Sequence, residues 1–256
     1  MKIVFHHDFL KQYDYTPAGD SGRLEPALRL LKKISDYQFV TPESAPLEAI
    51  ERAHTLLHIK DIQNSHEGVH DFYQLALLGA GGAILCADIA ASGEPAFGLI
   101  RPPGHHASRN SCWGFCYFNN IAVSLLHLRA AGKCKRAFIL DFDLHIGDGN
   151  YDILDPIGDY EIYNPSAPTE QEYLHLVQKH LDNAQPCDII VASAGFDQGI
   201  NDWGRLLSPE AYCTLGQMMK KFAEERCEGR RYALLEGGYN FDAMATNIRS
   251  FCEGFQ

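Results

Sequence analysis

Three side chains of metal-ligand type stand close together in residues 140–149, which read LDFDLHIGDG. Asp141, Asp143 and His145 follow the apolar stretch 137–140, which indicates the end of a buried strand. Side chains on a strand alternate between its faces, so these three point the same way if the strand continues through them. Two carboxylates and an imidazole suit a hard or borderline metal ion. The run therefore predicts a metal site, and the alternative is a solvated acidic loop.

Three further apolar strands also end in polar groups. Residues 97–100 lead into a Pro-Pro-Gly turn that presents the adjacent histidines His105 and His106. Residues 189–192 lead to Asp197, and residues 232–235 lead to a glycine pair followed by Tyr239. In open α/β sheets, ligand sites form at the carboxyl ends of the strands. The sequence therefore predicts one site that gathers groups from four strands.

These four runs, with the segment GFCYFNN at 114–120, resemble the zinc-dependent histone deacetylase superfamily, which includes acetylpolyamine amidohydrolases and acetoin-utilisation proteins. The resemblance covers the chain in order from Arg23 to Asn240. It implies an α/β architecture, the arginase–deacetylase fold, in which a parallel sheet lies between layers of helices. A chain of 256 residues with 46% hydrophobic content can bury one substantial core, so we expect 1–256 to be a single catalytic domain.

The resemblance implies that Asp143, His145 and Asp197 bind one zinc ion per chain. Two carboxylates and a neutral imidazole cancel the charge of the ion, and such a site is a weaker Lewis acid than an all-histidine one. A water molecule activated there needs a general base close by. A potassium ion bound by the backbone carbonyls of Asp141, Asp143 and His145 is a further implication.

The two histidines receive different roles from the same resemblance. His106 is the general base and later the acid for the leaving amine, whereas His105 acts mainly through its charge. Each needs a partner that fixes its tautomer. The family pattern pairs His105 with Asp141 and His106 with Asp148.

The substrate side of the site also follows from the resemblance. The Tyr239 hydroxyl polarises the substrate carbonyl together with the zinc, and such a donor commonly contributes about 3 kcal/mol. Gly114 and Phe115 form one side of a narrow tunnel for an alkyl stem, with the Gly114 carbonyl accepting the scissile amide hydrogen. Arg23 resembles the arginine of the internal cavity through which acetate leaves. An alternative from the residues makes Cys112 and Cys116 thiolate ligands with His105.

Three departures from the family pattern matter. Ile146 stands where a second histidine is usual, so we expect the packing beneath the site to differ. The stretch 148–173 is short and lacks the glycine-rich loop that is usual in the family. We therefore expect residues 164–169 to form the opposite wall of the tunnel and the mouth of the tunnel to be wider than in the family pattern. The serine that is usual at the potassium site has no clear counterpart in this sequence. We expect Asn164 or Ser166 to occupy its position.

Composition restricts the partners. The formal net charge of −11 argues against a broad nucleic-acid surface and slightly favours a cationic substrate. We expect no apolar segment long enough to span a membrane, and the start of the chain predicts a strand, not a signal peptide. The eight cysteines are scattered without a CxxC pair, which favours reduced thiols in the cytoplasm. The expected partner is an acylated amine such as acetyl-lysine or an acetylpolyamine, with no nucleic acid and no membrane.

Apolar spacing predicts an alternation of helices and short strands. The expected helices lie near 23–34, 72–91, 119–131, 170–182, 209–226 and 241–253. The expected strands lie near 2–6, 38–40, 96–100, 137–142, 160–163, 188–193 and 232–235. The glycines at 79–82 lie inside a helical pattern, so we reject a dinucleotide loop there and expect close helix packing.

Three functions remain. The first is a zinc-dependent amidohydrolase that removes an acetyl or related acyl group from an amine. The second is an arginase-like ureohydrolase with two manganese ions, which needs more ligands around paired metals than these motifs supply. The third is a catalytically weak or idle metal-binding member of the family that acts as an interaction module. The two adjacent histidines and Tyr239 count against the third, because a binding module needs none of them.

Overall fold

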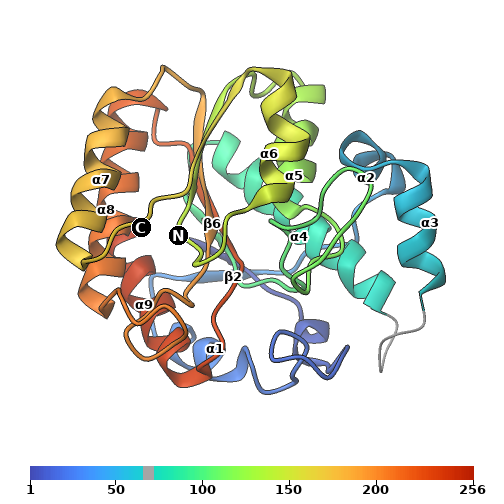
Figure 1. The fold of residues 1–256 in the computed structure, drawn as a ribbon, viewed down its shortest axis with the longest axis horizontal. Helices are drawn as coiled ribbons and strands as arrows, with labels where there is room; N and C mark the ends of the chain where they lie inside the picture. The colour runs from blue at the N-terminus through green and yellow to red at the C-terminus, as the bar shows by residue number, and fades with distance from the viewer. Residues whose placement is uncertain (66–71) are drawn as a thin grey trace.

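The computed structural model describes residues 1–65 and 72–256, and a parallel sheet of seven strands forms its centre (Figure 1). The strand order across the sheet is β2-β1-β3-β7-β6-β4-β5. The strands are β1 (Lys2–Val4), β2 (Gln38–Val40), β3 (Ala96–Gly98), β4 (Ala137–Asp141), β5 (Tyr160–Tyr163), β6 (Ile189–Ala194) and β7 (Arg231–Leu235).

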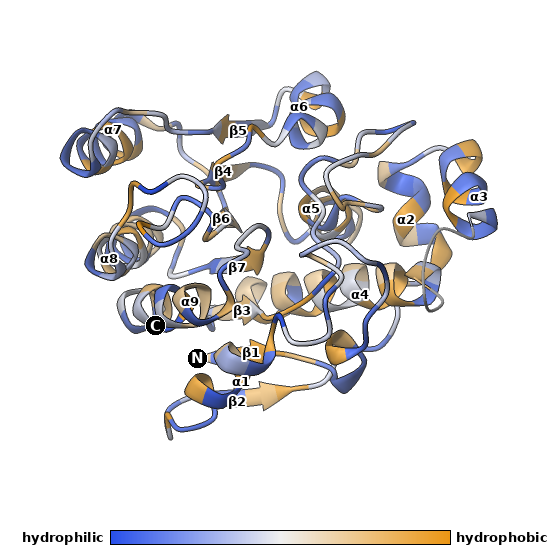
Figure 2. Cartoon of the chain, turned by 60° about the horizontal axis from the view of Figure 1, so that its bottom comes forward, coloured by the Kyte–Doolittle hydropathy of each residue, from blue (hydrophilic) through white to orange (hydrophobic). Residues whose placement is uncertain are grey.

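Helices cover both faces of this sheet, as Figure 2 shows, with α7, α8 and α9 on one side and α4, α5 and α6 on the other. Helices α2 and α3 lie outside the second layer. The helices are α1 (Glu25–Leu31), α2 (Leu47–Ala53), α3 (Leu56–Asn64), α4 (Phe72–Ala91), α5 (Asn120–Ala130), α6 (Asp148–Leu154), α7 (Glu170–Asn183), α8 (Pro209–Arg226) and α9 (Phe241–Phe255), with short 3₁₀ turns η1 (His7–Leu10) and η2 (Asp155–Ile157). This is the predicted α/β architecture.

The four strands with polar ends, β3, β7, β6 and β4, are neighbours at the centre of the sheet. Every residue of these strands is buried, because helices cover both faces, and their sequences are accordingly near-continuous apolar runs. All their pairings are parallel. The carboxyl ends therefore meet at one edge, and this brings the four sequence motifs together.

The predicted elements are present, and the differences lie at their ends. Helices α4 and α8 and strands β2 and β5 have the predicted bounds. The sequence did not indicate the short helices α2, α3 and α6. Strand β4 ends at Asp141, so the expectation that the strand carries Asp141, Asp143 and His145 on one face is wrong. Asp141 instead points at His105, while Asp143 and His145 lie in the turn that follows.

Helix α4 corrects the expectation about apolar segments. By length and composition it is able to cross a membrane, yet 61% of its most apolar window is buried inside the fold, as in the core helix of a globular protein. Its glycines let neighbouring backbone approach closely. A Cβ at Gly81 would lie 1.9 Å from the Glu43 carbonyl oxygen and 2.8 Å from the Ala45 nitrogen. The sequence-based preference for helix packing over a dinucleotide loop is confirmed.

We expect Gly81→Ala to destabilise the protein. Helix propensity alone would give a gain of about 1 kcal/mol, whereas forcing a carbon into packed backbone costs about 1–3 kcal/mol or more. Urea unfolding measures the net change. Gly79→Ala is the graded control, because its added carbon would lie 3.1 Å from the Arg101 carbonyl oxygen and the loss should be smaller. A gain in stability for Gly81→Ala would contradict this packing.

Candidate active site

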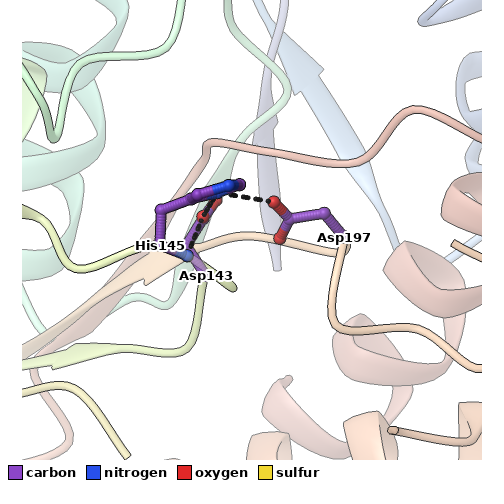
Figure 3. A group of neighbouring side chains, drawn as sticks. All are labelled: Asp143, His145 and Asp197. Carbon is purple, nitrogen blue, oxygen red and sulfur yellow. Dashed lines mark hydrogen bonds and ion pairs between the residues drawn. The ribbon is translucent and has the colours of Figure 1, made fainter. Parts of the chain in front are cut away.

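Asp143, His145 and Asp197 converge above the ends of β4 and β6, as Figure 3 shows. The Nδ1 atom of His145 lies 3.2 Å from Asp143 Oδ1 and 3.3 Å from Asp197 Oδ2. One ligand atom from each residue lies within 4.8 Å of the others, and this is the one such group found among the described residues. Asp197 Oδ2 is buried without a hydrogen-bond donor. The structure therefore brings the three predicted metal ligands together.

The charges of this cluster fit a divalent cation. Burial, followed by the neighbouring charge of Asp143, raises the pKa of Asp197 to about 7. Burial also acts against the charge of Asp143, but His105 and hydrogen bonds from His145 and Gly237 keep its pKa below the usual range. The hydrogen bond to Asp143 and the close contact with Asp197 raise the pKa of His145 to about 10. A proton on His145 thus balances two crowded carboxylates, and a metal ion held by a neutral imidazole would do the same.

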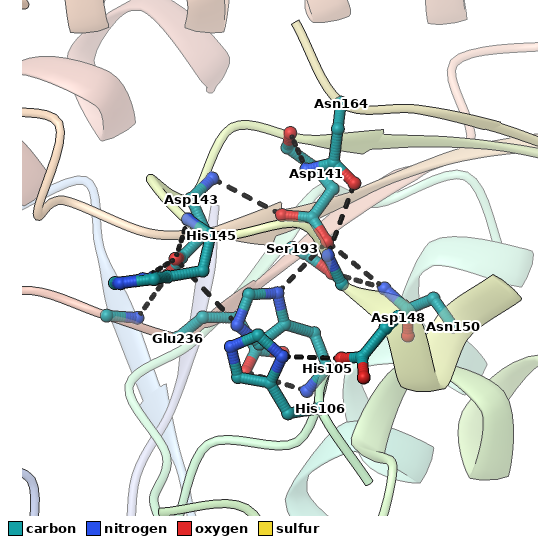
Figure 4. A network of polar contacts seen from close by, with 12 residues as sticks. His105, His106, Asp141, Asp143, His145, Asp148, Asn150, Asn164, Ser193 and Glu236 are labelled. Carbon is teal, nitrogen blue, oxygen red and sulfur yellow. Dashed lines mark hydrogen bonds and ion pairs between the residues drawn. The ribbon is translucent and has the colours of Figure 1, made fainter. Parts of the chain in front are cut away.

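His105 is buried at the centre of a network of carboxylates (Figure 4). Its Nδ1 atom lies 3.1 Å from Asp141 Oδ2, and its Nε2 atom lies 3.8 Å from Asp143 Oδ1. Burial lowers its pKa, but the charges of Asp141 and Asp143 outweigh burial and raise the pKa well above the ordinary value. The backbone N–H groups of Gly104 and His105 donate to Glu236 Oε2 at 2.6 and 3.1 Å. Glu236, which the sequence did not single out, therefore fixes the turn that presents the histidines.

His106 lies beside His105 in a different environment. Its Nδ1–H donates to Asp148 Oδ1 at 2.7 Å, and its ring lies 4.0 Å from the His105 ring, centroid to centroid. Burial, and then the charge of His105, lowers the pKa of His106 to about 4. The predicted pairs His105–Asp141 and His106–Asp148 are both present. The two adjacent imidazoles therefore have pKa values shifted in opposite directions.

Asp141 also anchors the turn after β4. Its Oδ2 atom accepts from Asn150 Nδ2 at 3.3 Å, and its carbonyl accepts from Asn164 Nδ2 at 2.8 Å. The Asn164 Oδ1 atom accepts from the Gly147 nitrogen at 3.3 Å. Asn164, not the exposed Ser166, thus lies against the carbonyls expected to bind potassium. The amide already satisfies one of these carbonyls, and the potassium site stays a prediction.

The loop after β7 carries Tyr239 to the site. The Gly237 nitrogen donates to Asp143 Oδ2 at 2.8 Å, and a Cβ at Gly237 would lie 2.5 Å from that oxygen. Asp202 Oδ2 accepts from the Tyr239 nitrogen at 2.7 Å, which fixes the backbone of the tyrosine. The Tyr239 ring stacks on Trp203 at 4.0 Å and meets Phe115 edge-on at 6.0 Å, centroid to centroid.

Gly114 and Phe115 lie where the resemblance predicted, on the histidine side of the site. Both have a left-handed backbone, with φ of 60° and 66°, which is strained for a phenylalanine. A Cβ at Gly114 would lie 2.4 Å from His106 Cδ2, so only glycine fits against the imidazole. His54 holds this loop from behind, since it contacts the Ser108 carbonyl and accepts from the Asn119 nitrogen, each at 2.9 Å.

Two expectations need correction. Ile146 is 64% exposed, so it does not alter packing beneath the site. Cys116 is buried and donates weakly to the Gly114 carbonyl at 3.5 Å, and neither it nor Cys112 belongs to the cluster of ligand atoms among the described residues. The sequence also gave no signal for Trp113 and Trp203, whose rings lie against His106 and Tyr239.

Comparisons with known proteins find a family model and several relatives that match this chain. The family model described as the histone deacetylase domain matches residues 19–157 and 159–255. A "Probable deacetylase" of Archaeoglobus fulgidus is 29% identical and aligns with 94% of this chain and 81% of its own. "Histone deacetylase 14, chloroplastic" of Arabidopsis thaliana is 32% identical, and "Polyamine deacetylase HDAC10" of Mus musculus is 28% identical. These two alignments cover 68% and 70% of this chain but only 51% and 33% of the relatives.

A solved structure shows the same fold. The "Crystal Structure of HDA15 HD domain" superimposes with a TM-score of 0.84 at 22% identity, over 98% of this chain and 88% of that one. The parallel sheet with helices on both faces is therefore the arginase–deacetylase fold predicted from the sequence motifs.

We expect one divalent transition-metal ion per chain and its loss in Asp197→Ala, because that change removes one of three ligands. Elemental analysis gives the metal count. A ligand at a thousand times its Kd stabilises a protein by about 4 kcal/mol, so added metal should raise the Tm of the wild type but not of the variant. The exposed Asp61→Ala is the matched control. Two metals per chain, or full retention in Asp197→Ala, would contradict this site.

Proposed function

The chain belongs to the histone deacetylase family, and from that premise we propose that it is a zinc-dependent amidohydrolase removing an acetyl or related acyl group from an amine. One observation carries the proposal most directly: His105 and His106, hydrogen-bonded to Asp141 and Asp148, lie side by side in the same site as the Asp143–His145–Asp197 cluster. Hydrolysis of an amide needs a base that accepts a proton and a fixed positive charge near the developing oxyanion.

The two histidines divide the proton transfer and the charge stabilisation. A bound zinc ion would supply a Lewis acid for the substrate carbonyl and for the attacking water. His106 Nε2 takes the proton of that water, since its Nδ1–H is committed to Asp148. The same proton then passes from His106 to the leaving amine nitrogen as the C–N bond breaks. His105 keeps its charge beside Asp141 and stabilises negative charge without transferring a proton.

Tyr239 and Gly114 bind the two ends of the amide group in this proposal. The Tyr239 hydroxyl donates to the carbonyl oxygen as negative charge develops there, and its ring is held by Trp203 and Phe115. The Gly114 carbonyl accepts the amide N–H. Phe115 faces Tyr239 and forms one apolar wall for the stem of the substrate.

Arg23 is proposed to bind the carboxylate product. The side chain is fully buried, and its Nε and Nη2 atoms donate to the carbonyls of Gly238 and Glu236. Its Nη1 atom is buried without a hydrogen-bond partner. A buried guanidinium with a free donor suits a carboxylate product.

The substrate class is part of this proposal. Relatives are named as histone deacetylases and as a polyamine deacetylase, and both groups act on acylated amines. The interaction-module alternative is not favoured, because an interaction module has no need of His105, His106 and Tyr239. The ureohydrolase alternative would need further ligands for a second metal ion. The described residues contain a single group of possible metal ligands, Asp143, His145 and Asp197. The cytoplasmic location stays a prediction.

We expect His106→Ala and Tyr239→Phe each to lower kcat at least about a hundredfold while folding and metal content remain intact, because they remove a proton carrier and an oxyanion donor. Steady-state kinetics with zinc-loaded protein measures the change. His127→Ala, a half-buried histidine paired with Asp88, and the exposed Tyr15→Phe are the matched controls. Near-normal turnover in either test variant removes that residue from the mechanism.

We expect weak activity on plain acetyl-lysine peptides and higher activity on another acylated amine. The short segment 148–173 removes part of one tunnel wall. Lost contacts with one or two methylenes reduce the specificity constant by about 10-fold or more. The measurement compares kcat/KM for an acetyl-lysine peptide, an acetylpolyamine and larger acyl-lysines. A clear preference for the acetyl-lysine peptide would show that the short segment does not open the site.

A further inference from the structure

Both tryptophans of this chain lie against proposed catalytic side chains. The Trp113 ring lies 3.8 Å from the His106 ring, centroid to centroid, at an interplanar angle of 34°. The Trp203 ring stacks on Tyr239. Trp113 is 55% exposed, although tryptophan is highly buried on average. A half-exposed indole at this position calls for a functional reason, and its contacts supply one.

The indole of Trp113 makes a second, directional contact. Its Nε1–H donates to Asp148 Oδ2 at 2.8 Å, while the other oxygen of the same carboxylate, Oδ1, accepts from His106 Nδ1 at 2.7 Å. The Asp148 carboxylate therefore accepts hydrogen bonds from both the indole and the imidazole, whose rings lie against each other. The Asp148 side chain is 49% exposed. Without the indole N–H, water would compete for the carboxylate and leave its orientation free.

Two rings pack closely against His106. The His105 ring lies 4.0 Å away and the Trp113 ring 3.8 Å away, centroid to centroid, and both are tilted relative to the imidazole. Gly114 lies against the Cδ2 edge of the imidazole. With Nδ1 bound to Asp148 and two rings against it, the imidazole is restricted, and Nε2 is the nitrogen left to handle protons.

We propose that Trp113 is a positioning residue for His106: its indole N–H fixes the Asp148 carboxylate, and its ring packs against the imidazole. The inference rests on the proposed function, since it concerns the residue proposed as general base. A substrate wall is the competing role for an exposed aromatic residue at the mouth. A wall acts on the substrate directly, whereas a positioning residue acts through Asp148.

A double-mutant cycle separates these two roles. Trp113→Phe keeps an aromatic ring but removes the N–H donor, and Asp148→Asn weakens the acceptor. We expect Trp113→Phe to lower kcat about tenfold, the usual effect of losing a hydrogen bond to a charged group, with KM changed less than about twofold. In the Asp148→Asn background the same change should lower kcat by less than about twofold, because the contact is already lost.

Two substrates sharpen the test. Zinc-loaded protein is assayed with an acetyl-lysine peptide and with N-acetylputrescine, whose stems differ. Positioning of the base lowers kcat by the same factor for both. Independent, multiplicative effects of Trp113→Phe and Asp148→Asn, or a change confined to the KM of one substrate, would overturn the proposal and leave the deacylase function standing.

Fluorescence tests the contact without using activity. Trp203→Phe leaves Trp113 as the single indole of the chain. Its emission should change when Asp148→Asn is added, because the acceptor of the indole N–H changes, and should not change with the exposed Asp61→Ala. Identical Trp113 emission with and without Asp148→Asn would show that the indole does not bind this carboxylate, and would overturn the proposal.

Discussion

The burial of two carboxylates side by side is the constraint on which the rest of the site depends. Asp143 and Asp197 are 3% and 0% exposed, and isolated buried charges are costly unless they are paired and hydrogen-bonded. Backbone N–H groups donate hydrogen bonds to three of the four carboxylate oxygens. The Gly237 and His145 nitrogens donate to Asp143, and the Leu144 nitrogen donates to Asp197 Oδ1. Only Asp197 Oδ2 lacks a donor among the described contacts, and it faces His145, where a cation would bind.

This compensation requires the parallel sheet. The groups that surround the carboxylates come from the ends of β3, β4, β6 and β7, which are distant in sequence and adjacent in the sheet. Parallel pairing places all four ends at one edge, so backbone N–H groups of one loop reach carboxylates of the next. The glycine at 237 is needed for the same reason, since a side chain there would collide with both carboxylates. The fold therefore supplies charge compensation as well as position.

The metal ligands and the histidine pairs could be predicted because the four motifs resemble a known family, whose pattern carries over to this chain residue by residue. The sequence could not predict contacts that depend on tertiary approach. Glu236 reads as part of a loop, yet it binds the turn of His105 through two backbone N–H groups. His54 carries no signal in the sequence, yet it contacts the Ser108 carbonyl and the Asn119 nitrogen at the two ends of the loop that contains Trp113. The sequence also could not show where strand β4 ends, and the structure ends it at Asp141, whose carboxylate contacts His105 and Asn150.

The short segment after Asp148 holds two residues of the site in place without a long loop. Helix α6 begins at Asp148 itself, so the residue that binds His106 is fixed by the first turn of a helix and needs no long loop. Asn164 then closes the other side, since its amide joins the Asp141 carbonyl to the Gly147 nitrogen across the turn that carries Asp143 and His145. Two hydrogen bonds from one side chain hold that turn against β5. The cluster of Asp143, His145 and Asp197 is thus held without a long loop after Asp148, and the half-exposed indoles of Trp113 and Trp203 lie against His106 and His145 beside it.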